Sequence, residues 1–307
     1  MISKAVLKYF STVFYFLFYF LVFSTQLAAE TIEKPFLWKI EGESATSYLF
    51  GTIHLPDARV TTLHSSVEQA FKDSEYVYTE IPLDTSDMLA QVNSLMLEAD
   101  KTLVDIVEAE LLQRANSLLK NINPVLTIEP FLKFKAWALA TSLPLLEQQL
   151  SNPGALPLDA QLYQRAGTEG KGTGGIETVQ EQLAYFDNLS QDEEIKMLRD
   201  TIEFMEVSNF QDQSLAEEFI LYYIRGDVDA FGALMVKYVK EDEFSKDFMK
   251  KILHDRNIIM ADRIHAKLKK SPDRSYFFAV GAGHYWGETG VQNLLINKGL
   301  SISRVNN

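Results

Sequence analysis

Two histidine motifs of the same design lie near opposite ends of this chain, and they restrict how it can fold. Gly51-Thr52-Ile53-His54 follows the apolar, strand-like segment 47–50, and Gly281-Ala282-Gly283-His284 follows the similar segment 276–280. A strand is a rigid support, and a glycine-bearing turn lets the backbone approach a ligand closely. In α/β proteins, chemistry is commonly placed just past a strand end. Both motifs can face one site if strands from both ends of the chain join one sheet.

A glutamate completes a plausible set of metal ligands. Glu80 ends the apolar run 76–79, which reads as a further strand. Two neutral imidazoles and one carboxylate, with positions left for water, suit Zn²⁺, Mn²⁺, Fe²⁺ or Co²⁺. A single strand-end histidine is more often a hydrogen-bonded structural residue, so it is the pair of motifs that is informative. The sequence therefore predicts a metal site of His54, His284 and Glu80, with Glu80 as either ligand or general base.

The first 29 residues have the composition of a secretory signal peptide. Lys4 and Lys8 precede the uncharged stretch 9–27, which ends at Ala28-Ala29. A basic start, an apolar core and small residues at the end are typical of such a signal. The alternative is an uncleaved anchor, because the apolar stretch has about the ~20 residues that span a bilayer. Membrane association through residues 9–27 is expected only if the segment is uncleaved, and both interpretations export the rest of the chain.

Composition excludes several classes of function. Without Lys4 and Lys8 the formal net charge changes from −13 to −15, and no basic stripe interrupts this acidity. Nucleic-acid binding is therefore not expected, since phosphate contacts need a basic patch. The chain has no cysteine, which excludes disulfides, thiol catalysis and thiolate metal sites. Any metal must be held by histidine, carboxylate or water.

The order of predicted elements indicates an α/β (α+β) fold with a mixed central sheet built from both ends of the chain. Residues 35–53 read as a β-hairpin, and a helix then leads to the strand 76–81. This order favours parallel pairing of the first motif strand with the Glu80 strand. Residues from about 86 to 270 read as a helix-rich insert, and strands return at 276–280 and 300–305. We expect one domain, residues 30–307, that contains this insert.

Two further residues lie where they could support the site. The glycine-rich segment 170–175 lacks the spacing of a phosphate-binding loop and instead suggests a short strand ending at Glu177. Arg256 falls on a long helix predicted over 245–270. A buried arginine near a carboxylate could hold Glu80 or Glu177 in place or stabilise an oxyanion. An exposed ion pair on that helix is the alternative.

Three other histidines are weaker candidates for the site. His64 opens an amphipathic helix, where we expect it to be exposed. His254 and His265 are eleven residues apart on the predicted long helix. That separation is about three helical turns, so the two side chains cannot bind one ion.

These motifs together resemble those of the TraB/PrgY/GumN family, which includes Tiki-like metalloproteases, and this chain looks like a bacterial-type member. The resemblance spans roughly residues 35–305 and keeps the family's order. It is carried by segments 50–56 and 77–80, Leu158-Asp159, segment 175–178 with Glu181-Gln182, Arg256-Asn257 and segment 280–284.

The resemblance implies a fold similar to the erythromycin esterase and ChaN-like group. For Tiki-like members it implies a protease that depends on a divalent metal, Mn²⁺ or Co²⁺, held by residues that correspond here to His54, His284 and Glu80. Animal members act on a secreted lipid-modified signalling protein and usually carry a membrane anchor after the domain, whereas no apolar segment follows residue 305 here. The substrate therefore does not carry over.

The first functional prediction is an exported, metal-dependent peptidase with a peptide or protein substrate, located in the periplasm or outside the cell, or anchored to the outer face of the cytoplasmic membrane. In it, Arg256 and Glu177 support the residues that hold the metal. One alternative is a non-catalytic protein that binds a peptide signal such as a pheromone. Another is a metal-free His/Glu esterase, by analogy at the level of the fold.

Overall fold

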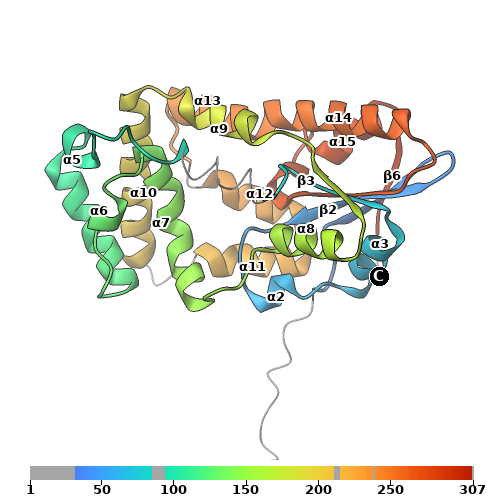
Figure 1. The fold of residues 1–307 in the computed structure, drawn as a ribbon, viewed down its shortest axis with the longest axis horizontal. Coiled ribbons are helices and arrows are strands. Elements are labelled where there is room, and N and C mark those ends of the chain that lie inside the picture. The colour runs from blue at the N-terminus through green and yellow to red at the C-terminus, as the bar shows by residue number, and fades with distance from the viewer. Residues whose placement is uncertain (1–31, 85–93, 211–214, 238, 306–307) are drawn as a thin grey trace, which may run out of the picture. The chain divides into compact units, whose positions relative to one another are not determined.

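The central sheet of the computed structural model is assembled from both ends of the chain (Figure 1). The structure describes residues 32–84, 94–210, 215–237 and 239–305. The predicted signal segment 1–29 and the start of the predicted helix-rich insert lie outside these residues. Residues Ile32–Asn307 form one compact unit.

Six strands form the sheet in the order β4-β3-β5-β2-β1-β6. The four strands β4, β3, β5 and β2 run parallel, whereas β1 and β6 are antiparallel to their neighbours. The mixed sheet drawn from both chain ends is therefore confirmed. The strand bounds are β1 Leu37–Glu41, β2 Thr46–Thr52, β3 Tyr76–Thr79, β4 Gly172–Gly175, β5 Tyr276–Gly281 and β6 Ser301–Arg304.

The predicted pairing of β2 with β3 is wrong, although their parallel direction is right. β5 lies between them, with Phe50 opposite Ala279 on one side and Tyr78 opposite Phe278 on the other. All six residues of β5 are buried. A strand that is apolar on both faces is most stable in the middle of a parallel sheet, where helices cover both sides. The strand from the carboxyl end of the chain therefore takes the central place.

The glycine-rich segment forms edge strand β4, as expected, but the strand ends at Gly175 and Glu177 follows two residues later. Aromatic rings of β3 lie over its backbone. A Cβ added at Gly172 would lie 2.2 Å from the Tyr76 ring, and one at Gly174 would lie 2.6 Å from the Tyr78 ring. The glycines are thus explained by close packing against tyrosines.

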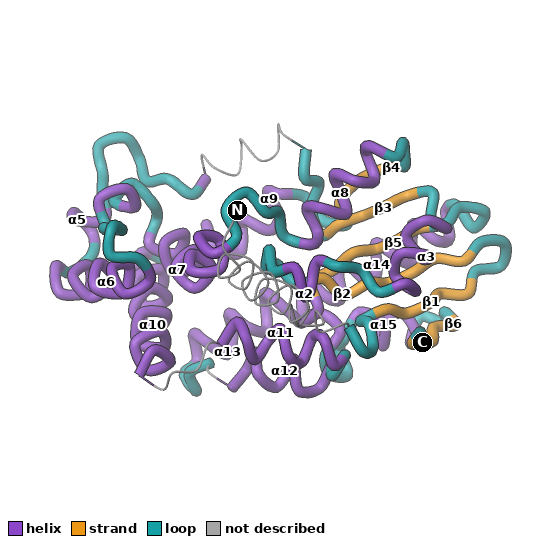
Figure 2. Tube along the Cα trace, turned by 90° about the horizontal axis from the view of Figure 1, so that it is seen from below, coloured by secondary structure: helices purple, strands orange, loops and turns teal. Residues whose placement is uncertain are grey.

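Helices cover both faces of the sheet. In Figure 1, α14 (Arg256–Lys270) and α15 (Val291–Asn297) lie on one side of the strands, and α3 (Ser65–Asp73) and α8 (Leu158–Thr168) lie on the other. Figure 2 shows the same layers from below. The core between these layers is aromatic, with Phe50, Phe71 and Phe277 fully buried and in contact.

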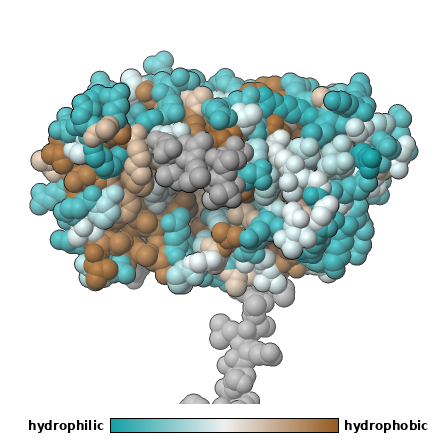
Figure 3. Space-filling view, in the orientation of Figure 1, coloured by the Kyte–Doolittle hydropathy of each residue, from teal (hydrophilic) through white to brown (hydrophobic). Residues whose placement is uncertain are grey.

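A second apolar core holds part of the predicted helical insert together. It joins α5 (Leu103–Ile106), α6 (Ala109–Ile122), α7 (Ala136–Ser151) and α10 (Gln191–Phe210). The face drawn in Figure 3 carries more hydrophobic residues over this helical end than over the sheet end. Within the described ranges, no helix is both long and apolar enough to cross a membrane.

The remaining segments complete the element order. They are α2 (Ala58–Thr61), η1 (Glu129–Phe131), α9 (Val179–Asp187), α11 (Leu215–Arg225), α12 (Val228–Lys237), α13 (Glu243–Met249), the π-helix η2 (Lys250–Asp255) and η3 (Ala282–Tyr285).

The first motif glycine, Gly51, lies inside β2. The sequence had suggested that it lies in a turn. Its backbone is packed against Phe36, because a Cβ added at Gly51 would lie 2.6 Å from the Phe36 Cβ. The Gly51 N–H donates to the Phe36 carbonyl, and the Tyr223 hydroxyl donates to the Gly51 carbonyl. The residue is glycine because the neighbouring chain leaves no room for a side chain.

We predict that Gly51→Ala destabilises the fold by ~1–3 kcal/mol, the usual cost of overpacking a core. Urea denaturation followed by circular dichroism measures this as a lower midpoint. Gly167→Ala is the matched control, because Gly167 lies in α8 with nothing within 4 Å of an added Cβ. The control is expected to match or exceed wild-type stability. Equal midpoints for Gly51→Ala and wild type would contradict the packing argument.

Candidate metal centre

The three predicted ligands meet at one edge of the sheet. His54 follows β2 by two residues, Glu80 directly follows β3, and His284 lies in η3 directly after β5. These strands are parallel and adjacent in the order β3-β5-β2, so their carboxyl ends open on the same edge. A Cβ added at Gly281 would lie 2.9 Å from Glu80 Oε1, 3.6 Å from His54 Nε2 and 3.6 Å from His284 Cδ2. The three side chains therefore surround one small region.

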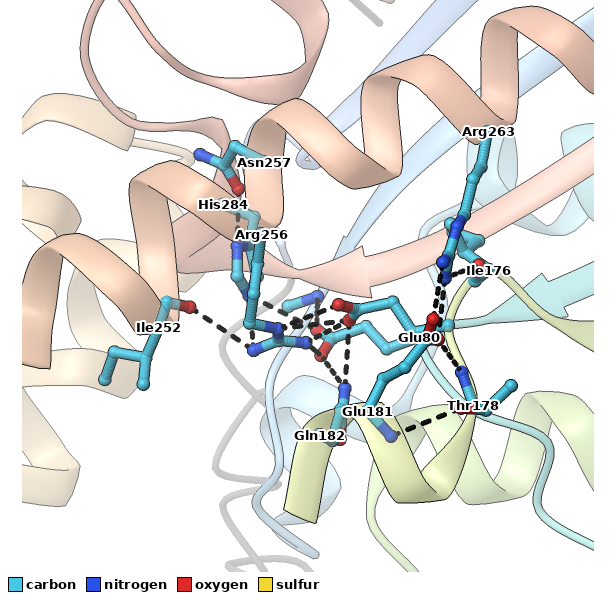
Figure 4. A network of polar contacts seen from close by, with 12 residues as sticks. Glu80, Ile176, Thr178, Glu181, Gln182, Ile252, Arg256, Asn257, Arg263 and His284 are labelled. Atoms are coloured by element: carbon cyan, nitrogen blue, oxygen red, sulfur yellow. Dashed lines mark hydrogen bonds and ion pairs between the residues drawn. The ribbon is translucent and has the colours of Figure 1, made fainter. Parts of the chain in front are cut away.

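His284 is buried and held in one orientation (Figure 4). The Asn257 amide nitrogen donates to the Thr289 carbonyl at 2.8 Å, which turns the amide oxygen toward His284 Nδ1 at 2.6 Å. Nδ1 must then carry a proton, and Nε2 carries a lone pair that faces Arg256 Nη1 at 3.4 Å. Burial lowers the pKa of His284 to about 4, against the opposing effect of Glu80. The residue is therefore neutral at physiological pH, the form that binds metals.

Glu80 is a largely buried carboxylate, 12 % exposed, that accepts hydrogen bonds from several donors. Its Oε1 accepts from the Gly281 N–H at 2.7 Å, and its Oε2 accepts from Arg256 and from Gln182 Nε2 at 3.0 Å. Burial opposes the charged form, but His284, Arg256 and His54 outweigh it and hold the pKa of Glu80 well below its usual range. Oε1 also lies 3.7 Å from His284 Nε2. Glu80 is thus ionised, with one oxygen beside the imidazole lone pair.

Arg256 is held between two carboxylates. Its Nη2 donates to Glu177 Oε2 at 2.6 Å as well as to Glu80, and its Nε donates to Glu177 Oε2 at 3.1 Å. The Arg256 side chain is 12 % exposed and that of Glu177 is 1 % exposed. Burial opposes the charge on Arg256, but the two glutamates raise its pKa. Of the two interpretations from sequence, the structure therefore supports a buried arginine and not an exposed ion pair.

The helix that carries Arg256 is interrupted immediately before it. The sequence predicted one helix over 245–270, but the chain forms α13, then the π-helical turn η2, then α14 beginning at Arg256. A π-helical turn inserts a residue into the helical repeat and so rotates the side chains that follow it; such turns are frequent at functional sites.

Asp159 is a site residue that the sequence reasoning did not assign. It lies in the first turn of α8, and its Oδ1 is 3.2 Å from His54 Nδ1. The His54 side chain is 55 % exposed, and partial loss of water around its ring opposes protonation, but Asp159 and, to a smaller extent, Glu80 outweigh this effect and raise the pKa of His54 to about 9. The Leu158-Asp159 pair of the family pattern could have pointed to Asp159. That pair does not say which histidine the carboxylate contacts.

The weaker histidine candidates do not join the site. His64 caps α3 by accepting from the Ser66 N–H and is partly buried. His254 pairs with its neighbour Asp255.

His54, His284 and Glu80 are of the residue types that bind a divalent ion, although their side chains are not close enough together in this structure to act as ligands of one ion. Among the residues that the structure describes, no three His, Asp or Glu side chains are gathered closely enough to hold a metal. Arg256 engages Glu80 and Asp159 engages His54. Two imidazole nitrogens and a carboxylate oxygen are nevertheless the ligands that Zn²⁺, Mn²⁺ and Co²⁺ accept. In that set, Asn257 and Asp159 would orient the two imidazoles.

A cavity of about 490 Å³ opens beside these residues. Its walls include His54, Glu80, Arg256 and His284 on the sheet side, and apolar residues of the helical segments on the other. Its volume lies within the ~300–1,000 Å³ typical of ligand pockets. A cleft between sheet and helices therefore reaches the polar cluster.

Comparison with known proteins gives relatives in animals and bacteria. The chain is 27 % identical to Metalloprotease TIKI2 of Xenopus tropicalis over 88 % of this chain and 59 % of that protein. It is 27 % identical to Metalloprotease TIKI1 of Danio rerio, with 88 % and 63 % covered. It is 24 % identical to the uncharacterized protein YbaP of Shigella flexneri, with 81 % and 87 % covered. The chain thus spans about three fifths of the length of these two Tiki proteins.

No solved structure matches the chain, so the expected likeness to the erythromycin esterase and ChaN-like fold stays a prediction. The family resemblance, in contrast, is supported by a direct match of the sequence. A family pattern described as TraB/PrgY/gumN matches residues 36–304, which include both histidine motifs, Glu80, Asp159, Glu177 and Arg256. This match across most of its length shows that the chain belongs to the TraB/PrgY/gumN family.

Proposed function

We propose that this protein is an exported peptidase that depends on a divalent metal. The observation that carries the proposal is the meeting of His54, Glu80 and His284 around Gly281, at the mouth of an apolar cavity. The relatives named metalloproteases support a divalent metal and a peptide or protein substrate. Export rests on the composition of residues 1–29, which lie outside the described residues.

The metal would be held by His54, His284 and Glu80, with Mn²⁺ or Co²⁺ expected by resemblance and Zn²⁺ compatible with the same ligands. Such an ion supplies Lewis-acid chemistry that polarises a carbonyl and lets water lose a proton near neutral pH. The depressed pKa of Glu80 favours a ligand role over general base, because a carboxylate with so low a pKa accepts protons poorly near neutral pH.

Arg256 would act next to the scissile bond. Its Nη2 and Nε are bound to carboxylates, whereas Nη1 makes only long contacts of 3.4 Å, to the Ile252 carbonyl and to His284 Nε2. An N–H on Nη1 could therefore donate to the oxygen of a substrate carbonyl as negative charge develops there. Glu177 and Gln182 would keep the guanidinium and Glu80 in place.

We predict that His54→Ala/His284→Ala abolishes both tight metal binding and metal-dependent cleavage of peptides by residues 30–307. Asn257→Ala is expected to weaken metal affinity by about 10–100-fold, because it removes the acceptor that orients His284. Metal content after dialysis and peptide cleavage with added Mn²⁺, Co²⁺ or Zn²⁺ measure these effects. His265→Ala, on the same helix as Asn257, is the control and should behave as wild type.

A folded wild-type protein that binds no metal and cleaves no peptide would overturn the peptidase proposal. The two histidines would then be structural, and a non-catalytic peptide-binding protein would become the better interpretation. Cleavage without metal that is lost in the double variant would instead favour the metal-free His/Glu esterase class.

Metal affinity is predicted to rise with pH. Because the pKa of His54 is raised to about 9 in the metal-free protein, its imidazole is protonated below that pH and must lose a proton to bind metal. His284, with a pKa of about 4, releases none in this range. The affinity measured by isothermal titration should increase about tenfold per pH unit from about pH 6 and level off near pH 9.

Asp159→Asn provides the matched test of this pH dependence. Without the carboxylate, the pKa of His54 should fall toward the ordinary value of about 6.5, so the affinity should level off at a lower pH. A release of two protons, or none, would show that His54 is not the residue that titrates.

For export, we expect the mature protein to begin at Glu30. Expression of residues 1–307 in a bacterium, followed by fractionation and determination of the amino-terminal residue, would test this. A full-length protein in the membrane fraction would indicate an uncleaved anchor over residues 9–27, and a full-length protein in the cytoplasm would contradict export.

A further inference from the structure

The cavity beside the candidate metal centre is continuous with it. His54, Glu80, Arg256 and His284 lie in the same wall as Gly281, Ala282 and Gly283. A group bound in this cavity is therefore next to the bond on which the polar residues would act. Its chemistry should decide which substrates are accepted.

The rest of the cavity is mainly apolar, with Gln148, Gln182 and Tyr185 among its polar side chains. Its walls come from α7, α9, α10, α11, α12 and η2. Beyond the residues of the site, the one charged residue among the described lining residues is Glu147, which is exposed. A charged substrate side chain that is bound among the apolar residues would therefore lose water without gaining an ion-pair partner. The aromatic and methionine lining residues include Phe186, Phe204, Phe219, Phe231, Met205 and Met235.

Met235 connects this apolar wall to the second histidine motif. A Cβ added at Gly283 would lie 2.4 Å from Met235 Sδ. Gly283 directly precedes His284, so the Met235 side chain lies against the loop that carries a candidate ligand. The adjacent residue on α12, Val236, is exposed and does not line the cavity.

A smaller cavity of about 270 Å³ is also lined by His54 and shares Leu55, Leu145 and Gln148 with the large one. Its walls carry the amide side chains of Gln148, Gln149 and Asn152. A peptide with one residue in the large cavity could therefore continue past His54 into polar surroundings.

We propose that the large cavity is a subsite for a large apolar or aromatic side chain of the peptide substrate, next to the scissile bond, and that Met235 helps to determine this specificity. The proposal rests on the proposed peptidase function, because it assigns the substrate class of the same site. The cavity is large enough for such a side chain, and flexible methionines adapt to different apolar shapes.

The first experiment uses the metal-loaded protein, residues 30–307, and peptides of a Gly/Ser frame that carry Phe, Leu, Ser or Lys at one position. We expect cleavage next to Phe or Leu, with a kcat/KM at least about tenfold higher than for Ser, as apolar pockets commonly achieve. The peptide with Lys should be the poorest substrate. Mass spectrometry identifies the bond that is cut.

Variants on α12 test the role of Met235. Met235→Glu should reduce the ratio of kcat/KM for Phe over Lys at least about tenfold, because a carboxylate in the wall favours the cation. Met235→Leu should keep the wild-type preference. Val236→Glu is the matched control, since it adds the same charge one residue away, and it should leave the ratio unchanged.

The outcomes separate this proposal from the peptidase function. Metal-dependent cleavage with equal kcat/KM for all four peptides would overturn the subsite while the peptidase stands. If no peptide is cleaved, the peptidase function fails, and equilibrium binding of the same peptides still tests the cavity. Tighter binding of the Phe peptide that is lost in Met235→Glu supports the subsite, and equal binding of the Phe and Ser peptides overturns it.

Discussion

The buried ion pairs of Arg256 are the interaction on which the site most depends. One guanidinium joins Glu80 at the end of β3, Glu177 just after β4 and the start of α14, three segments that are far apart in the sequence. Removing one member of a buried charged group typically costs ~3–5 kcal/mol, since it leaves the others without a partner. Arg256 therefore sets the position of Glu80 and keeps it ionised, and it fixes the edge of the sheet from which the candidate metal centre is built.

The two histidines of the site have pKa values that are shifted in opposite directions. His284 is buried beside Arg256 and receives only an amide oxygen at Nδ1, so it remains neutral. His54 faces Asp159 and is charged until about pH 9. In the metal-free protein, the site thus holds one cationic and one neutral imidazole together with an ionised Glu80. A metal ion that binds there would displace the proton of His54 and become the positive charge next to Glu80.

Sequence reasoning could predict the elements and the residues that follow strand ends, because glycine, histidine and apolar runs act locally. The β1–β2 hairpin, the histidine motifs and the strand before Glu177 are of this kind. The place of β5 between β2 and β3 could not be predicted, since strand order depends on which strand buries both faces. The contact of Asp159 with His54 and the π-helical turn before Arg256 also depend on tertiary packing, which no local pattern records.

The central place of β5 also bears on how the molecule forms. The strand that separates β2 from β3 is made only after residue 275, so the middle of the sheet cannot be completed while most of the chain is still being synthesised. Contacts between residues so distant in sequence carry a large loop-closure cost, and folds rich in them form slowly. His284 arrives with the same strand, just past its end. The completed site is thus a late product of folding, and truncated or partly folded chains would lack it.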